Sequence, residues 1–155
     1  MQTIARDQAK KYAFDWRDEP LLRVREGETI AIETWDASTG FFKTPEDKAI
    51  PAKRPGFDRS PPMANPIAGP VFIEGAERGD VLVACIEEVE VADYSWVAVG
   101  PKRGPLGEST RWPELSTEYT TKIFPHTPGP SGTMLDGNLQ FSDSISWPIT
   151  PFIGT

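Results

Sequence analysis

Proline and glycine are the residues that most restrict the fold of this chain. The 155 residues include 16 prolines and 13 glycines, which recur along most of the sequence. Proline removes a backbone donor and glycine weakens the interior of helices and strands, so long regular elements have little room between them. Since 38% of the residues are hydrophobic, the chain can still bury a core. The combination predicts a turn-rich globular β protein with little helix, and not a disordered chain.

Apolar runs mark the expected strands. Tyr12, Phe14 and Trp16 alternate with polar or small residues, which is the period of a half-buried strand. The run 80–91 is continuously apolar in its first half, as is typical of a strand covered on both faces, and its Cys85 is expected to be a small core residue. The predicted strands are 11–16, 21–24, 29–35, 70–74 and 80–91.

A similar turn precedes two of these strands. The segments "RVREGETIAIE" and "GAERGDVLVACIE" both place a charged residue, a glycine and an acid directly before apolar residues. We expect Gly27 and Gly79 to adopt positive φ, and Glu28 and Asp80 to accept local backbone hydrogen bonds. Such turns recur in β proteins generally, and an ancestral repeat is the alternative explanation.

Charge and cysteine content limit the class of partner and the compartment. With 16 basic and 23 acidic residues the formal charge is −7, which disfavours binding to nucleic acid or to an anionic membrane. No apolar run approaches the ~20 residues of a membrane helix, and "MQTIARDQAKK" carries charges where a signal peptide is apolar. The single cysteine cannot form an internal disulfide. We therefore expect a cytoplasmic chain.

Composition excludes metal sites that need two or more histidines, whereas a Ser–His–Asp triad remains arithmetically possible. The chain has one histidine, His126, so a blue-copper or multi-histidine zinc site cannot be built from these residues alone. There is no G-x-S-x-G motif and no phosphate-binding glycine pattern. Because His126 lies in "FPHTPGP", among turn-forming residues, we expect it in a surface loop.

The remaining chemical candidates are acidic and lie near a long loop. Asp36 follows the predicted strand 29–35 in "IETWDASTG", so it is expected at the rim of the sheet. There it can be a general base, a metal ligand or the first residue of an Asx-turn. The segment 37–69 lacks periodicity, and loops of this length are usually functional or disordered. Near its end Asn65 precedes Pro66, so we expect it extended and able to present its amide to a ligand.

Three stretches resemble the acetamidase/formamidase family. They are "EPLLRVREGETIAIETWDASTG", the more specific "NPIAGPVFIEGAERGDVLVACIEEV", and the closing "PITPFIGT". The resemblance is firm over residues 19–91 and at the last eight residues. It implies a mainly β, β-sandwich-like (jelly-roll-type) fold with long loops. It also implies that residues 1–155 form the N-terminal β-rich part of such a domain, truncated at the C-terminal end, with the second half of the family pattern absent.

The resemblance implies hydrolysis of a short aliphatic amide, formamide or acetamide, to a carboxylate and ammonia. A divalent metal ion, zinc or calcium, would assist by acidifying water and polarising the carbonyl. Asp36 is the expected metal ligand or base and Asn65 the expected pocket residue, with Glu33 and Glu74 as weaker candidates. The expected partners are a small amide substrate and either further copies of the chain or a complementary C-terminal half. Two alternatives stay open: an inactive β half-domain that associates with a partner, and a β-sandwich ligand-binding module that uses exposed tryptophans.

Overall fold

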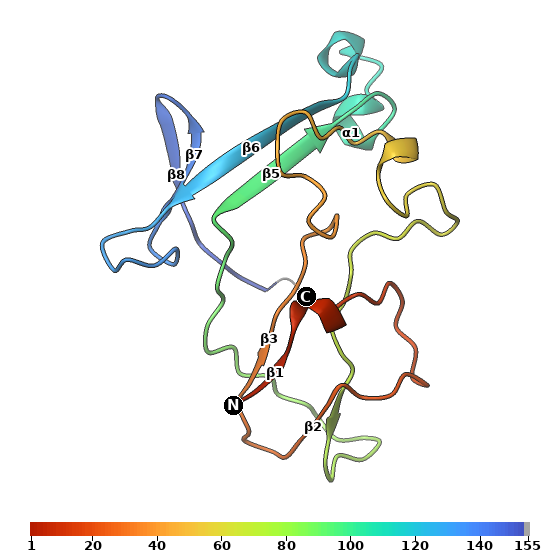
Figure 1. Cartoon of the computed structure of the whole chain (residues 1–155), viewed down its shortest axis with the longest axis vertical. Helices are drawn as coiled ribbons and strands as arrows, with labels where there is room; N and C mark the ends of the chain where they lie inside the picture. The colour runs from red at the N-terminus through yellow and green to blue at the C-terminus, as the bar shows by residue number, and fades with distance from the viewer. Residues whose placement is uncertain (154–155) are drawn as a thin grey trace. The chain divides into compact units, whose positions relative to one another are not determined.

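Two units make up the part of the chain that the computed structural model describes, residues 1–153 (Figure 1). The first unit contains Met1–Phe41 and Pro51–Leu82. The second unit contains Phe42–Ile50 and the chain from Val83 onward. The long loop predicted at 37–69 is confirmed as irregular chain with one short 3-10 turn, Pro51–Lys53.

Short parallel strand pairs form the first unit. Strand β1 (Gln2–Ile4) pairs with β3 (Ile30–Ile32), and β2 (Leu22–Val24) pairs with β4 (Val71–Ile73). A 3-10 turn, Arg6–Gln8, follows β1. Ile4, Ala9 and Val24 are buried. The predicted strands at 21–24, 29–35 and 70–74 are therefore confirmed, in shorter form.

An antiparallel sheet in the order β5-β6-β7-β8 forms most of the second unit. Its strands are β5 (Tyr94–Val99), β6 (Thr120–Thr127), β7 (Asn138–Ser142) and β8 (Ile145–Pro148). The helix α1 (Gly104–Gly107) and the 3-10 turn Pro113–Ser116 lie between β5 and β6 in the sequence. Phe42 is fully buried, and its ring centroid lies 4.2 Å from that of Trp96 on β5. The sequence pattern singles out no strand after residue 91, so this sheet was missed.

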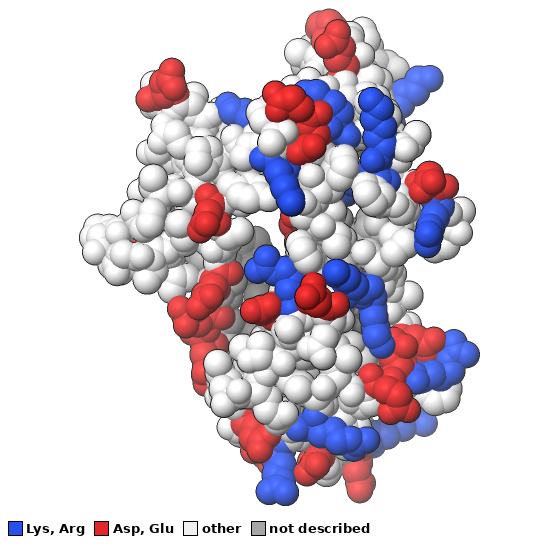
Figure 2. All heavy atoms as spheres, viewed as in Figure 1, with Lys and Arg blue, Asp and Glu red and all other residues white. Residues whose placement is uncertain are grey.

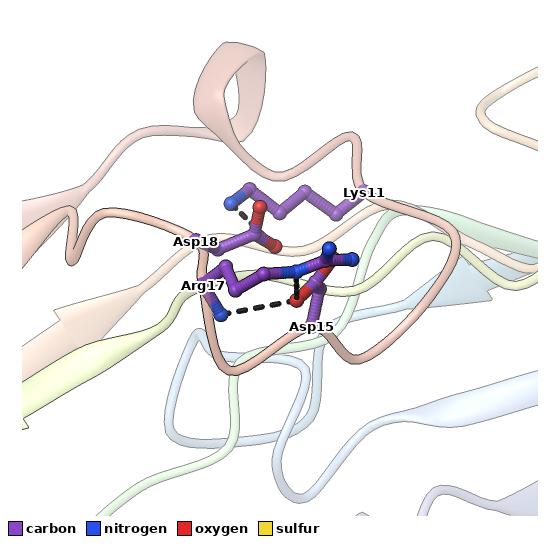
Figure 3. A network of polar contacts seen from close by, with 4 residues as sticks. All are labelled: Lys11, Asp15, Arg17 and Asp18. Atoms are coloured by element: carbon purple, nitrogen blue, oxygen red, sulfur yellow. Dashed lines mark hydrogen bonds and ion pairs between the residues drawn. The ribbon is translucent and has the colours of Figure 1, made fainter.

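The predicted strand at 11–16 is wrong. Only Lys11 forms a bridge, to Ile67, and the side chains of Phe14 and Trp16 are both 93% exposed. Asp15 instead accepts hydrogen bonds from the backbone and the guanidinium of Arg17, and Lys11 pairs with Asp18 at 2.8 Å (Figure 3). These local bonds give the backbone a turn in place of a strand ladder.

The predicted strand at 80–91 is also wrong. Residues 81–92 form no strand, and Val81, Leu82 and Val83 are each more than 70% exposed. Cys85, expected in the core, is exposed. A strand needs a neighbour for its backbone groups, and none of the described residues provides one here. An apolar run alone therefore does not make a buried strand.

The repeated turn behaves as the sequence predicts. Gly27 and Gly79 have φ of 79° and 109°. The carboxylate of Glu28 accepts the backbone N–H of Arg25 at 3.2 Å, and that of Asp80 accepts the N–H of Glu77 at 2.8 Å. Glycine and acid therefore have the same structural role before both apolar segments.

The structure is mainly β with little helix, as predicted. The packing of two sheets into a jelly-roll sandwich stays a prediction. No helix within residues 1–153 is long and apolar enough to cross a bilayer. On the face drawn in Figure 2, basic and acidic side chains are interspersed, without the large basic patch that nucleic-acid binding uses.

Candidate functional site

Asp36 closes a tight turn after β3 in the first unit. One carboxylate oxygen, Oδ1, accepts the backbone N–H of Ser38 at 2.6 Å and that of Gly40 at 3.3 Å. The backbone oxygen of Asp36 accepts the N–H of Thr39 at 3.0 Å. This is an Asx-turn, one of the roles that the sequence allows. The turn fixes one oxygen of an exposed carboxylate, and the other oxygen, Oδ2, has no hydrogen bond among the described residues of the unit.

The residues after Asp36 are held from several sides. The hydroxyl of buried Ser38 accepts a hydrogen bond from the guanidinium of Arg54, which also donates to the carbonyl oxygen of Ala37 at 3.4 Å. The hydroxyl of Thr39 lies 3.1 Å from that of Tyr12. Thr39 has φ of 54°, an uncommon conformation for a β-branched residue. The turn that carries Asp36 is thus a fixed element of the first unit.

Asn65 meets this turn through its backbone. Its N–H donates to the carbonyl oxygen of Ala37 at 3.1 Å, so the two predicted site residues lie at the same turn. The expectation that Asn65 is extended is wrong, because its φ is 54°. A following proline disfavours the right-handed helical region, and asparagine tolerates the left-handed region better than most residues. The exposed side chain leaves its amide accessible.

Trp35 supports the base of the turn. Its indole N–H donates to the carbonyl oxygen of Arg6 at 2.8 Å. The charged groups of Arg6 and Lys10 lie 5.3 and 5.5 Å from the ring centroid, within reach of a cation–π interaction. The residue directly before Asp36 in the sequence therefore has a half-buried ring with two cations within cation–π distance.

The two weaker carboxylate candidates make structural contacts. Glu33 accepts the backbone N–H of Arg6 at 2.8 Å, which ties β3 to the chain after β1. Glu74 pairs with Arg25 at 3.3 Å. Neither is brought to the turn of Asp36 by a contact in the structure.

A complete metal site is not formed by the described residues. Within residues 1–153 no group of three or more His, Cys, Asp or Glu side chains converges on one point. Asp36 can offer one carboxylate oxygen, whereas a catalytic zinc takes three protein ligands and calcium takes six to eight oxygens. The residues present therefore do not fit a bound ion by themselves.

His126 lies in the second unit, and its expected place in a surface loop is wrong. It belongs to β6, and β7 pairs with β6 only at His126 and Thr127. The rest of β6 has no strand on that side, so Pro125, which has no N–H to donate, is tolerated there. Its Nδ1 is 2.6 Å from the carbonyl oxygen of Ala92, and its Nε2 is 3.1 Å from the hydroxyl of Ser95. The carbonyl can only accept, so Nδ1 carries a proton and donates to it, while Nε2 and the Ser95 hydroxyl form a second hydrogen bond. The ring borders an open apolar depression of about 270 Å³.

The histidine–serine pair and the depression beside it were not predicted from the sequence. The depression is lined by side chains of β7, β8 and the residues that follow, among them Leu139, Phe141 and Trp147. The alternation in "YSWVAV" and the β-branched run in "TTKIF" are the signals that would have indicated β5 and β6. The prolines on both sides of His126 masked the second of these signals.

Comparison with known proteins gives a fold relationship. No family model and no curated protein sequence matches the chain. A predicted acetamidase/formamidase from Thermoanaerobacter tengcongensis superimposes over 96% of the chain with a TM-score of 0.71 and 26% identity. The chain has the fold of acetamidase/formamidase structures. An acetamidase from Bacillus halodurans superimposes over 94% of the chain with a TM-score of 0.67 and 24% identity.

The match is unequal in length. The chain spans 42% of each solved structure, while nearly all of its own residues are included. The resemblance predicted from the sequence motifs is thus confirmed at the level of the fold. Of the "PITPFIGT" motif, residues 154–155 lie outside the described part of the chain.

Proposed function

We propose that the chain is part of an amidase that hydrolyses a short aliphatic amide, formamide or acetamide, to a carboxylate and ammonia. The observation that carries this proposal is the superposition of almost the whole chain on a predicted acetamidase/formamidase at a TM-score of 0.71. Residues 1–155 would be the N-terminal β-rich part of the catalytic domain. Association with a complementary C-terminal half, or with further copies of the chain, and a cytoplasmic location belong to the same proposal.

Asp36 is the proposed chemical group of this chain. Amide hydrolysis needs a nucleophile, stabilisation of the oxyanion, and a proton for the departing ammonia. The hydrogen bonds from Ser38 and Gly40 hold one oxygen of the Asp36 carboxylate, and the other has no hydrogen bond among the described residues. That second oxygen can accept a proton from water or bind a cation.

Asn65 is the proposed pocket residue. Its amide can donate to a substrate carbonyl or accept from a substrate amide, which is the pairing that a primary amide offers. Its backbone bond to Ala37 keeps it at the turn of Asp36. Formamide and acetamide differ by one methyl group, which changes binding by only ~1–3 kcal/mol and depends on the shape of the complete pocket.

A divalent zinc or calcium ion is a further part of the proposal and would polarise the carbonyl when bound. Asp36 would supply one ligand. The other ligands would have to come from residues outside the described set, since residues 1–153 hold no ligand cluster.

Ammonia release from formamide and acetamide tests the activity. The purified chain is assayed with and without added Zn²⁺ or Ca²⁺, and release above the no-protein rate supports the amidase. A silent, soluble monomer favours a binding module. A silent chain that self-associates favours an inactive half-domain.

Substitution of Asp36 tests the assignment of the site. Asparagine keeps an acceptor for the backbone N–H groups and removes the charge, so Asp36→Asn should fold normally and lower ammonia release by about 100-fold or more. Asp47→Asn is the matched control, because Asp47 also accepts two backbone N–H groups, from Lys43 and Thr44, in a different loop. Unaltered turnover and metal content in Asp36→Asn would contradict the assignment of Asp36 as metal ligand or base.

A further inference from the structure

The segment Val83–Ile86 begins the longer of the two segments of the second unit and has no neighbouring strand among residues 1–153. The side chains of Val83 and Ile86 are 75% and 57% exposed, and Cys85 is also exposed. None of the four residues forms a backbone–backbone hydrogen bond within the described chain. Apolar side chains and backbone donors and acceptors are thus presented together.

Such a segment is a template for strand addition. An added strand satisfies the backbone groups and covers the apolar side chains in one step. The residues are β-branched or apolar and contain no proline, which suits a paired strand. The continuous apolar run that suggested a strand in the sequence is therefore explained if a second polypeptide supplies its neighbour.

Charge argues against parallel pairing with a second copy of this chain. Glu88 and Glu90 follow the segment, are exposed, and form no ion pair with any described residue. Parallel pairing of two copies places each glutamate opposite its own equivalent, and like charges directly opposite each other destabilise a strand pair. Antiparallel pairing centred on Ala84 places Asp80 opposite Glu88 and Arg78 opposite Glu90, so charge neither favours nor opposes it. A partner with basic residues opposite both glutamates suits the segment better than either arrangement.

The fold comparison indicates where such a strand comes from. More than half of each solved acetamidase/formamidase chain lies outside the part that this chain matches. We propose that Val83–Ile86 pairs with an apolar strand from that unmatched part of the fold, and that Lys or Arg residues at one end of the strand face Glu88 and Glu90. This deepens the proposed association with a complementary half, and it rests on the fold, not on amidase activity.

Amide hydrogen exchange with synthetic peptides tests the pairing. Overlapping 15-residue peptides tile the unmatched part of the solved Thermoanaerobacter tengcongensis chain, and each is added to the full chain. We expect one or two peptides with alternating apolar residues and a basic end to slow exchange at Ala84–Ile86 by roughly tenfold or more at saturation. The readout is binding, so it is independent of whether the chain releases ammonia.

Two variants separate strand pairing from unspecific adhesion. Val83→Pro removes a backbone donor at an exposed position and should abolish the protection while leaving the sheet β5–β8 intact. Glu88→Lys combined with Glu90→Lys should weaken binding about tenfold at about 0.01 M salt, with a smaller difference at about 1 M. Phe14→Ser, in the first unit and also exposed to solvent, should bind like the unmodified chain.

Three results would overturn the proposal. One is that no peptide slows exchange at Ala84–Ile86. Another is that the peptides that do so are acidic, or bind the double lysine variant as tightly as the unmodified chain. The third is protection of the segment that rises with the concentration of the chain alone, because a second copy would then be the occupant.

Discussion

At the scale of single residues, Gly40 links the turn of Asp36 to Trp35. Its φ is 71°, and an added Cβ would lie 2.7 Å from Cζ3 of the Trp35 ring. Gly27 has a similar φ of 79° with no atom within 4 Å of such a Cβ. Both Gly→Ala changes should cost about 1–2 kcal/mol for the left-handed backbone, and Gly40→Ala should cost more because the ring must move. Urea unfolding measures both values, and equal losses would contradict the close packing against Trp35.

Asp15 is the residue whose protonation the structure constrains most clearly. The guanidinium of Arg17 donates to both carboxylate oxygens, at 2.9 and 2.6 Å, and its backbone N–H adds a third bond (Figure 3). These bonds hold the pKa of Asp15 below its usual value, and the charge of Lys11 contributes least. The folded chain therefore binds fewer protons than the unfolded chain between the lowered pKa and about 3.9. The stabilisation is present above about pH 4 and is lost as the pH falls through the lowered pKa.

An NMR titration of the Asp15 carboxyl carbon checks this dependence on pH. Arg17→Gln should raise the pKa of Asp15 towards its ordinary value, because the charged donor is lost. Lys11→Gln should raise it less, since Lys11 acts only through its charge. An Asp15 pKa that does not respond to Arg17→Gln would contradict the bidentate pair.

At the scale of elements, the segment Phe42–Ile50 is tied to the sheet of the second unit by its first residue. Phe42 is fully buried and its ring lies against Trp96 on β5. Phe42→Ala should therefore destabilise the second unit by about 3–5 kcal/mol, the range for a buried phenylalanine. Phe141→Ala is the control, because Phe141 is 46% exposed and should cost less. Trp96 fluorescence during urea unfolding reports both, and a smaller effect for Phe42 than for Phe141 would refute the packing.

The elements also show what the sequence can and cannot predict. Three strands were predictable because each is a short apolar run before or after a turn in which a glycine has positive φ and an acid accepts a backbone N–H. They are Leu22–Val24, Ile30–Ile32 and Val71–Ile73. The runs 11–16 and 80–91 carry equally good patterns, yet pairing depends on distant partners that periodicity does not encode. For the candidate site, the place of Asp36 directly after a predicted strand indicated that it lies where the chain leaves the sheet. The hydrogen bond of Asn65 to Ala37, the next residue, arises from loop geometry, which no sequence pattern specified.

At the scale of the whole molecule, exposed apolar side chains and net charge act against each other. The formal charge is −7 at pH 7 and the isoelectric point is near 4.8, so repulsion between copies disappears as the pH falls towards that value. Trp147, on the exposed strand β8, is 66% exposed and borders the apolar depression beside His126. Lower charge leaves such surfaces free to associate.

We therefore expect association to increase from pH 7 towards pH 4.8, and also with added salt at pH 7, which screens the same repulsion. Light scattering on the purified chain measures it. Trp147→Gln should reduce association at pH 4.8, whereas Lys53→Gln, in the first unit, should leave it nearly unchanged, since it removes one charge and no apolar surface. Association that is independent of pH would show that net charge does not control it. Association unaffected by Trp147→Gln would show that the contact between copies does not involve Trp147 on β8.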